Sequence, residues 1–361
     1  MKLKIKVCFL TTTLLLSLVA FGKTTKKNFK PQYKQFELLI SVAAHNSPDS
    51  TQLDELQKEY LSWKFGMFIH FNMATFTERE WANGYEDPAF FSPNKLDCNQ
   101  WAEVAKNAGM KYAVLTVKHT GGWCLWDSKY TISHDVTAFK NYKNGTGDIV
   151  REFVDAFRKR GIKVGLYYCF PGNYAGRWGN VLPEGKPDLH GLPPEAEGDY
   201  VGFIKKQLTE LMTYYGEIDL IWIDQFSNKY AYSAWPEIRR HIKSYQPQCL
   251  VIGNNAINYQ ESDLLGYEYS YWMKKDPHRA LPLAGNTNPS EVCDQIGPGW
   301  FWSTKENYAN LKSAEDILNM LFLSNSRSAN YLLNIAPDNT GLIPAHTVQR
   351  LKEFANLKDK K

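Results

Sequence analysis

Short apolar runs alternate with amphipathic segments along most of the chain, from residue 60 onward. Runs rich in β-branched and aromatic residues predict strands, and segments with apolar residues three or four positions apart predict helices. This alternation is typical of βα units, which build a parallel sheet. The predicted strands cover residues 65–71, 112–118, 163–170, 219–226, 250–254 and 331–335, with two weaker candidates at 265–269 and 300–302.

The helical segments between these strands begin and end at residues with suitable chemistry. Asp97, Asp148, Asp199 and Ser313 each stand directly before a segment of helical period. Their side-chain oxygens can accept a backbone N–H of the first turn. Three segments are followed by a glycine that can adopt the positive φ of a helix end, namely Gly109, Gly161 and Gly216.

The order of the elements predicts one α/β domain, a (β/α)8-like TIM barrel over residues 51–361. A doubly wound sheet is less consistent, because no G-x-G-x-x-G follows the first predicted strand. Residues 171–198 are rich in Gly and Pro and follow a strand, so we expect a long loop at the mouth of the barrel.

The amino terminus has the pattern of a secretory signal peptide. Residues 1–22 combine three lysines, an apolar run over 7–21, and the small residues Ala20 and Gly22. The run is short for a membrane span, and no cysteine follows it to accept a lipid. We therefore expect a secreted or periplasmic protein without membrane insertion, whose residues 23–50 form a polar leader.

Charge and cysteine content exclude several classes of function. The signal peptide, residues 1–22, holds three of the 42 basic residues and none of the 38 acidic ones, so the remainder is close to neutral and a nucleic-acid partner is not expected. The cysteines beyond the leader are odd in number and widely spaced, without a C-x-x-C. We interpret them as mostly buried apolar residues: Cys98, Cys124, Cys169, Cys249 and Cys293.

Polar and aromatic side chains gather at the carboxyl ends of the predicted strands, which is where barrel enzymes place their chemistry. Hydrogen-bonding groups beside aromatic rings are typical of a sugar site. Glu80 and Trp81, in the loop after the first strand, would add a carboxylate and an indole. The strand ends present His70, Lys118 with His119, Tyr167 with Tyr168, Trp222 with Asp224, and Asn254 with Asn255.

Hydrolysis of a glycoside needs two carboxyl groups, one on each side of the scissile bond. Asp224 ends an apolar strand and is the first candidate. For the acid/base, Glu268 stands between tyrosines that would desolvate it, and Glu291 is the alternative. No HExxH or paired-ligand spacing suggests a catalytic metal, and no G-x-S-x-G suggests a serine hydrolase, so we expect no cofactor.

Several motifs together resemble the α-L-fucosidases of glycoside hydrolase family 29. Their order is that of the family, from about residue 63 to residue 341. Taken singly each is weak, and their specificity lies in the set. They are residues 64–70 (KFGMFIH), Glu80 with Trp81, Lys118 with His119, 166–168 (LYY), 222–224 (WID), 291–302 (EVCDQIGPGWFW) and 332–337 (LLNIAP).

The resemblance implies a (β/α)8-like catalytic domain and a retaining mechanism with Asp224 as nucleophile. In the family the acid/base lies on variable loops, which leaves Glu268 and Glu291 both open, with Glu268 preferred. The implied substrate is a fucosylated oligosaccharide or glycoconjugate. Contacts to the sugar would fall on His70, Glu80, Trp81, His119, Tyr168 and Trp222, with Trp300 packing on its apolar side.

The chain departs from the family pattern in three places. The family usually has a second histidine and then Asp-Gly after the first, whereas residues 119–122 read HTGG. An arginine that often follows the fifth strand is missing, and Asn254 or Asn255 would take its place. Many members also carry a C-terminal β-sandwich, and this sequence ends at Lys361, soon after the last predicted strand.

Two other functions are compatible with the same residues. A glycosidase for a related sugar such as α-L-galactose is one, because a pocket discriminates weakly against one added hydroxyl group. The other is a secreted sugar-binding protein that kept the cleft and lost the chemistry. Asp224 argues against the second.

Overall fold

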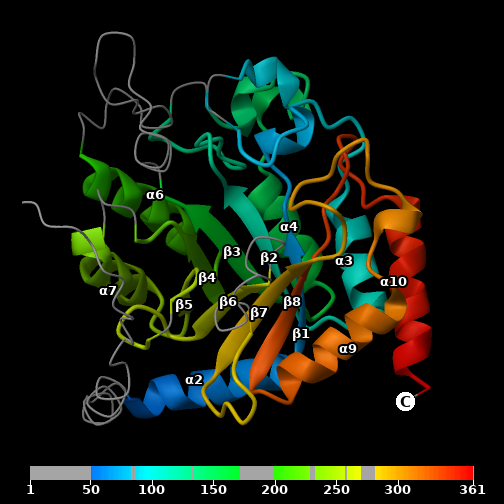
Figure 1. Cartoon of the computed structure of the whole chain (residues 1–361). Coiled ribbons are helices and arrows are strands. Elements are labelled where there is room, and N and C mark those ends of the chain that lie inside the picture. Colours follow the sequence, from blue (N-terminus) through cyan, green and yellow to red (C-terminus); the bar gives the residue numbers. More distant parts are fainter. Residues whose placement is uncertain are drawn as a thin grey trace, which may run out of the picture. The chain divides into compact units, whose positions relative to one another are not determined.

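Eight parallel strands form one sheet in the order β5-β4-β3-β2-β1-β8-β7-β6, which curls into a nearly closed barrel (Figure 1). The computed structural model describes residues 50–360 except 83, 85, 132–133, 171–198, 228–231, 257 and 270–280. The predicted (β/α)8 fold is confirmed. The strands are β1 (Phe65–Ile69), β2 (Tyr112–Lys118), β3 (Lys163–Cys169), β4 (Leu220–Asp224), β5 (Leu250–Gly253), β6 (Leu265–Tyr269), β7 (Ser290–Gln295) and β8 (Ala329–Asn334).

Helices connect most of the strands, and the four predicted caps are confirmed, because each cap side chain accepts a first-turn N–H. The glycines at 109, 161 and 216 all have φ between 69° and 77°. The helices are α2 (Ser50–Trp63), α3 (Cys98–Asn107), α4 (Ile149–Arg158), α6 (Tyr200–Tyr214), α7 (Trp235–Tyr245), α9 (Ala314–Asn325) and α10 (Ala345–Lys358). Short 3₁₀ turns lie at Met73–Phe76, Pro88–Phe90, Val136–Ala138, Lys143–Gly145, Tyr232–Ala234 and Tyr308–Asn310.

One predicted strand was wrong. Residues 300–302 are not a strand, and the seventh strand is Ser290–Gln295 instead. The pattern hid it because its sequence carries two acids, Glu291 and Asp294, at positions that are fully buried. Each acid has its own partners inside the fold, so burial does not require an apolar side chain here.

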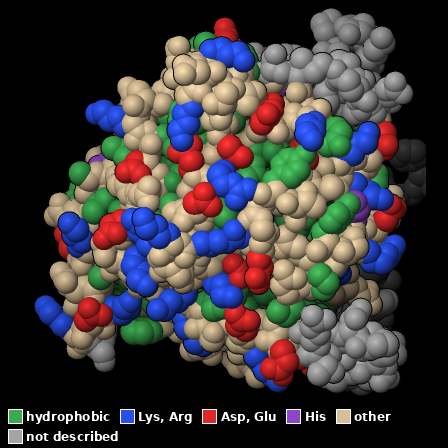
Figure 2. Space-filling view, turned by 180° about the vertical axis from the view of Figure 1, so that it is seen from behind, with side chains coloured by type: hydrophobic (Ala, Val, Ile, Leu, Met, Phe, Trp, Pro, Cys, Tyr) green, Lys and Arg blue, Asp and Glu red, His purple; other side chains and the backbone are tan. Residues whose placement is uncertain are grey.

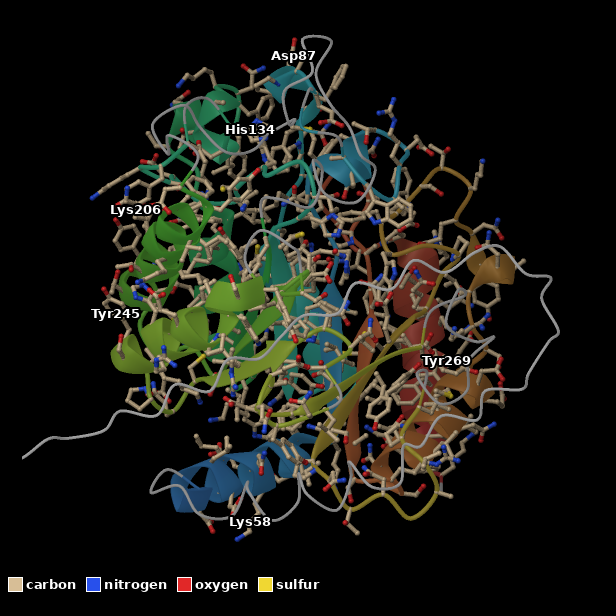
Figure 3. All side chains as sticks on the ribbon, turned by 60° about the vertical axis from the view of Figure 1, so that its left-hand side comes forward. Lys58, Asp87, His134, Lys206, Tyr245 and Tyr269 are labelled. Atoms are coloured by element: carbon tan, nitrogen blue, oxygen red, sulfur yellow. The ribbon has the colours of Figure 1, made fainter. Side chains whose placement is uncertain are left out.

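Helix α2 closes the amino end of the barrel, where it lies across the ends of the strands (Figure 1). Its residues Tyr60 and Trp63 pack with Tyr112 at the start of β2, with ring centroids 5.2–5.6 Å apart. Lys58 of α2 and Asp87 lie at opposite ends of the barrel (Figure 3). The end near Asp87 is therefore the carboxyl end of the strands.

The surface mixes both signs of charge. Lys and Arg side chains alternate with Asp and Glu over the face in Figure 2, without a large area of one sign. The five cysteines within the described residues are buried with free thiols, as predicted. Among the described helices, none is both long enough and apolar enough to cross a bilayer.

The barrel has a seam between β5 and β6, where no ladder hydrogen bonds join the two strands. The described part of the connection, residues 254–256 and 258–264, contains no helix. Side chains replace the missing ladder: Asp263 accepts from the Val251 N–H at 2.8 Å, and Ser262 accepts from the Gly253 N–H at 3.0 Å. The buried backbone donors of β5 that have no strand partner on this side are thus satisfied by side chains.

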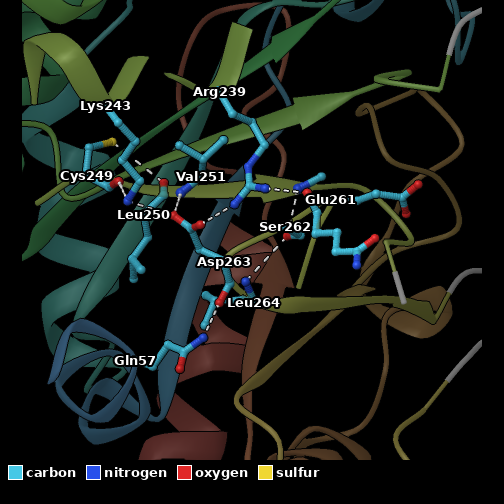
Figure 4. Close-up of polar contacts among 12 residues, drawn as sticks. Gln57, Arg239, Lys243, Cys249, Leu250, Val251, Glu261, Ser262, Asp263 and Leu264 are labelled. Carbon is cyan, nitrogen blue, oxygen red and sulfur yellow. Dashed lines mark hydrogen bonds and ion pairs between the residues drawn. The ribbon is translucent and has the colours of Figure 1, made fainter. Parts of the chain in front are cut away.

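Asp263 is the centre of this seam (Figure 4). Its carboxylate, 1% exposed, also accepts from Arg239 at 2.5 Å and pairs with Lys243 at 2.8 Å. Its backbone oxygen accepts from Gln57 of α2 at 2.6 Å. One side chain therefore joins β5, α7 and the segment that leads into β6.

We predict that Asp263→Ala lowers the free energy of unfolding by about 3 kcal/mol, because a buried N–H and two cations lose their acceptor. Urea denaturation followed by circular dichroism measures the change. Asp155→Ala is the control, since Asp155 is exposed and lies 3.8 Å from Arg151. Its expected change is below about 0.5 kcal/mol. Equal effects of the two substitutions would contradict the importance of the seam.

Candidate active site

Two carboxylates meet at the carboxyl end of the barrel, on either side of the seam. Asp224 is the last residue of β4, and Glu268 lies near the end of β6. The amide nitrogen of Asn254, just after β5, donates to Asp224 Oδ1 at 3.0 Å and to Glu268 Oε2 at 3.1 Å. This shared nitrogen limits the two oxygens to a separation of about 6 Å, close to the spacing of retaining glycosidases.

Three donors hold the Asp224 carboxylate. Besides Asn254, the backbone N–H of Gln225 donates to Oδ1 at 2.8 Å, and the Tyr167 hydroxyl donates to Oδ2 at 2.8 Å. Gln225 has φ 58°, a left-handed conformation that turns the chain sharply after the strand. Asp224 forms no ion pair with any of the described residues, so neutral donors fix its orientation.

Glu268 is held from the neighbouring loop. Asn255 Nδ2 donates to its Oε2 at 3.1 Å, and Asn255 Oδ1 accepts from its backbone N–H at 3.3 Å. Asn255 has φ 57°, which brings its side chain alongside β6. The two asparagines expected in place of an arginine therefore contact carboxylates.

Glu291, the alternative acid/base, lies in a different environment. It is 2% exposed inside the barrel and accepts from Tyr60 at 2.5 Å, Tyr112 at 2.9 Å and Trp222 at 2.7 Å. Burial raises its pKa, and these three donors oppose that shift. Its partners belong to the interior and the amino end of the barrel, so the structure does not bring Glu291 to the Asp224 carboxylate.

His70 and His119 lie side by side with ring centroids 5.8 Å apart. Burial lowers the pKa of His119 to about 3. Burial, followed by the neighbouring His119, lowers the pKa of His70 well below its ordinary value. Both imidazoles are therefore neutral at physiological pH.

The tautomer of His70 follows from its partner. Its Nδ1 lies 2.7 Å from Asn334 Oδ1, while Asn334 Nδ2 donates to the backbone oxygen of Trp300. Because the amide oxygen can only accept, Nδ1 carries the proton and Nε2 is an acceptor. The Nδ1 atom of His119 has Thr120 Oγ1 at 3.1 Å, so this threonine occupies the place of the family's second histidine and holds the first.

Aromatic rings surround the two imidazoles. Trp300 lies 5.0 Å from His70, and Phe301 lies 4.8 Å from His119. Tyr167 stacks on His119 at 5.5 Å and on Trp222 at 5.2 Å. Phe301 was not among the predicted site residues; it is buried directly behind both histidines. Only its position next to Trp300 could have suggested it.

Glu80 and Trp81 lie in the segment after β1, as expected. Both carboxylate oxygens of Glu80 accept from the Trp300 backbone N–H at 3.1 Å, so Glu80 holds the loop that carries Trp300. Burial raises its pKa, and backbone donors of Trp300 and Phe301 partly oppose this. The neighbouring Trp81 is 40% exposed, which leaves its indole accessible to a ligand.

Tyr168, which was predicted to contact the substrate, lies away from the Asp224 carboxylate. Tyr168 is fully buried on the outer face of the barrel, where its hydroxyl donates to Gln207 at 2.7 Å and accepts from Lys118 at 3.1 Å. Successive residues of a strand point to opposite faces, so Tyr167 is the tyrosine that faces Asp224. Trp222 shares the inner face and is 3% exposed, beneath the site.

No group of three His, Cys, Asp or Glu side chains within the described ranges is arranged to hold a metal ion. The chemistry that these residues can perform is proton transfer and nucleophilic attack by carboxylates.

A carboxylate pair at the carboxyl end of a (β/α)8 barrel, beside neutral imidazoles and aromatic rings, is the arrangement of a barrel glycoside hydrolase. A family profile described as Alpha-L-fucosidase matches residues 40–359. The chain belongs to this family, glycoside hydrolase family 29.

Individual relatives agree with this assignment. "Alpha-L-fucosidase 1" of Arabidopsis thaliana is 30% identical over 329 residues, covering 83% of this chain and 60% of the relative. "Alpha-L-fucosidase isoenzyme 1" from Paenibacillus thiaminolyticus has a TM-score of 0.66 at 25% identity, over 85% of this chain and 76% of that chain. A family 29 member from an unknown rumen bacterium has a TM-score of 0.65 at 29% identity, over 84% of this chain and 56% of that chain. The chain thus spans 60% of its Arabidopsis relative's length.

We predict that stability falls as the pH drops below about 6.5, the ordinary histidine pKa, because the unfolded chain then binds protons that buried His119 and His70 do not. For His119 the loss continues down to its folded pKa of about 3, at up to about 1.4 kcal/mol per pH unit. Urea denaturation at several pH values measures the slope. His119→Gln is expected to flatten it, and an unchanged slope would contradict a neutral buried imidazole.

Proposed function

We propose that the chain hydrolyses terminal α-L-fucosides with retention of configuration. The observation that carries the proposal is the Asp224, Asn254 and Glu268 cluster, which holds one oxygen of each carboxylate within about 6 Å of the other at the mouth of the barrel. Membership of the alpha-L-fucosidase family indicates that the sugar is α-L-fucose. The substrate class is fucosylated oligosaccharides or glycoconjugates.

In the first step Asp224 attacks the anomeric carbon and Glu268 gives its proton to the departing glycosidic oxygen. The C–O bond to the aglycone breaks as the bond to the aspartate oxygen forms. Oδ1 of Asp224 already accepts two hydrogen bonds, whereas Oδ2 accepts only the one from Tyr167 among the described residues. We therefore assign the attack to Oδ2, which has fewer donors among the described residues and keeps a lone pair for the sugar.

In the second step a water molecule attacks the same carbon and releases Asp224. Glu268, now ionised, takes a proton from this water and returns to its starting state. Two inversions at one carbon give net retention. The cycle consumes one water molecule and requires no redox chemistry.

The neutral side chains around the carboxylates suit a deoxysugar. Nε2 of His70 would accept a hydrogen bond from a ring hydroxyl, and Trp81 offers an accessible indole face for the apolar side of the sugar. Trp300 and Phe301 would border the methyl group of fucose. Glu80 acts through the Trp300 loop that it holds, in addition to any contact with a hydroxyl group.

The test is hydrolysis of an aryl α-L-fucoside by wild type and Asp224→Ala, with and without azide. We expect turnover to fall on the order of 10⁴-fold, as for other enzymic nucleophiles. Azide should restore it by taking the place of the carboxylate, giving a fucosyl azide of inverted configuration. Fucose binding without turnover of fucosides, fucosylated oligosaccharides or α-L-galactosides would instead identify a sugar-binding protein.

Glu268→Ala and Glu291→Ala are the matched controls in the same assay. Glu268→Ala should lose about 10²- to 10⁴-fold on poor leaving groups and little on an activated aryl group, with azide giving retained configuration. Glu291→Ala should lose stability, because three buried donors lose their acceptor. If Glu291→Ala shows the dependence on the leaving group instead, the assignment of Glu268 is wrong.

We further propose that the protein is exported and acts in the periplasm or outside the cell. The support is the sequence of residues 1–22, which lie outside the described residues. Amino-terminal sequencing of the protein isolated from its own cells should find a chain that begins after Gly22. A chain that begins at Met1 would contradict export.

A further inference from the structure

We infer that Asn254 is a positioning residue that sets the ionisation of both site carboxylates, rather than a donor to the sugar. The catalytic part of this inference rests on the proposed function, in which the two carboxylates are the nucleophile and the acid/base. Its structural basis is independent: one amide nitrogen has a carboxylate oxygen on each side, at 3.0 Å and 3.1 Å.

The amide of Asn254 has no N–H left for a substrate. An asparagine side chain carries two donor hydrogens, and here one points to Asp224 and the other to Glu268. Its backbone is also fixed, because the Asn254 N–H donates to the Ile223 oxygen at 2.9 Å, next to Asp224 in the chain. Asn254 therefore has a fixed backbone directly after β5, and its side chain contacts both β4 and β6.

The two hydrogen bonds that Asn254 donates, called the Asn254 bridge below, have the same electrostatic effect on both carboxylates. Two carboxylates whose oxygens lie at most about 6 Å apart repel each other when both are ionised. An N–H donor stabilises the ionised form and lowers the pKa. Asn254 counteracts the repulsion at both carboxylates at once, without the cation that an arginine would bring.

Other groups among the described residues also contact or influence this pair. From β3 the Tyr167 hydroxyl contacts Asp224, and the Cys169 thiol lies beside that tyrosine. From β7 the buried Cys293 thiol is within electrostatic range of both carboxylates, of Glu291 and of Asp294. From the loop after β5, Asn255 contacts only Glu268 of the two. Asn255 therefore provides a matched control for Asn254.

The experiment is the pH dependence of kcat/KM for an aryl α-L-fucoside. The acidic limb reports the ionisation of the nucleophile, and the basic limb reports loss of the acid's proton. Asn254→Ala should move both limbs upward by about one pH unit, the equivalent of one hydrogen bond to a charged group. Asn255→Gly, which keeps the left-handed backbone of residue 255, should move mainly the basic limb.

A second variant separates this role from packing. Asn254→Leu has nearly the same size but neither an N–H donor nor a charge, so both limbs should again move upward. If Asn254 only fills space, Asn254→Leu would leave the limbs where they are in wild type. Unmoved limbs in both Asn254 variants, with activity lowered at all pH values, would overturn the inference.

The ionisation can also be read without any substrate. Selective ¹³C labelling of Asp and Glu carboxyl groups, assigned with Asp224→Asn and Glu268→Gln, gives both pKa values by NMR titration. If wild type fails to hydrolyse fucosides, the proposed function fails, yet the upward shift in Asn254→Ala still supports the bridge. If wild type is active and the NMR titration of Asn254→Ala matches that of wild type, the bridge alone is overturned.

Discussion

The closure of the barrel across β5 and β6 is the constraint on which the site depends. No ladder hydrogen bonds join these strands. Asp263 and Ser262 satisfy β5 through their side chains, Asn255 continues the contact to β6, and the Gly266 N–H donates to the Ala256 oxygen. A close backbone approach makes this possible, since a Cβ on Gly266 would lie 3.1 Å from the Gly253 oxygen. The last link of the seam, Asn255 to Glu268, belongs to the site itself. The separation of the two carboxylates is therefore a property of how the barrel closes.

A second constraint comes from the alternation of side chains along each strand. The inner face of β3 and β4 carries Tyr167, Trp222 and Asp224, whereas Tyr168 faces the helices. Below them Glu291 accepts from the Trp222 indole and from Tyr60 of α2. Contacts thus continue from the helix that closes the amino end to the tyrosine that orients Asp224. A buried carboxylate inside a barrel is stable only with such a set of donors, and here it fixes the floor of the site.

Sequence patterns were sufficient for the fold where burial coincided with apolar residues. The central strands and the caps at Asp97 and Asp148 follow from local composition alone. β7 was missed because Glu291 and Asp294 are buried through partners distant in the sequence, Tyr60 and Lys312 among them. Tyr167 could have been preferred to Tyr168, because the register pairs Tyr167 with Trp222 and Cys169 with Asp224. The contact of Asn254 with both carboxylates could not have been predicted from the sequence, because it depends on how the barrel closes between β5 and β6, which no ladder joins.

The departures from the family pattern have one electrostatic consequence in common, because they leave neutral groups around Asp224. Asp224 is oriented by a phenol, a backbone N–H and an amide, all neutral. The two nearby imidazoles are also neutral, because burial lowers the pKa of each. The transition state of glycoside hydrolysis is oxocarbenium-like and carries positive charge at the anomeric carbon. Oriented neutral dipoles hold the carboxylate in place without cancelling its charge, whereas a cation beside it would oppose the charge that develops on the sugar. Asn254, which stands where the family often has an arginine, therefore orients Asp224 without cancelling its negative charge.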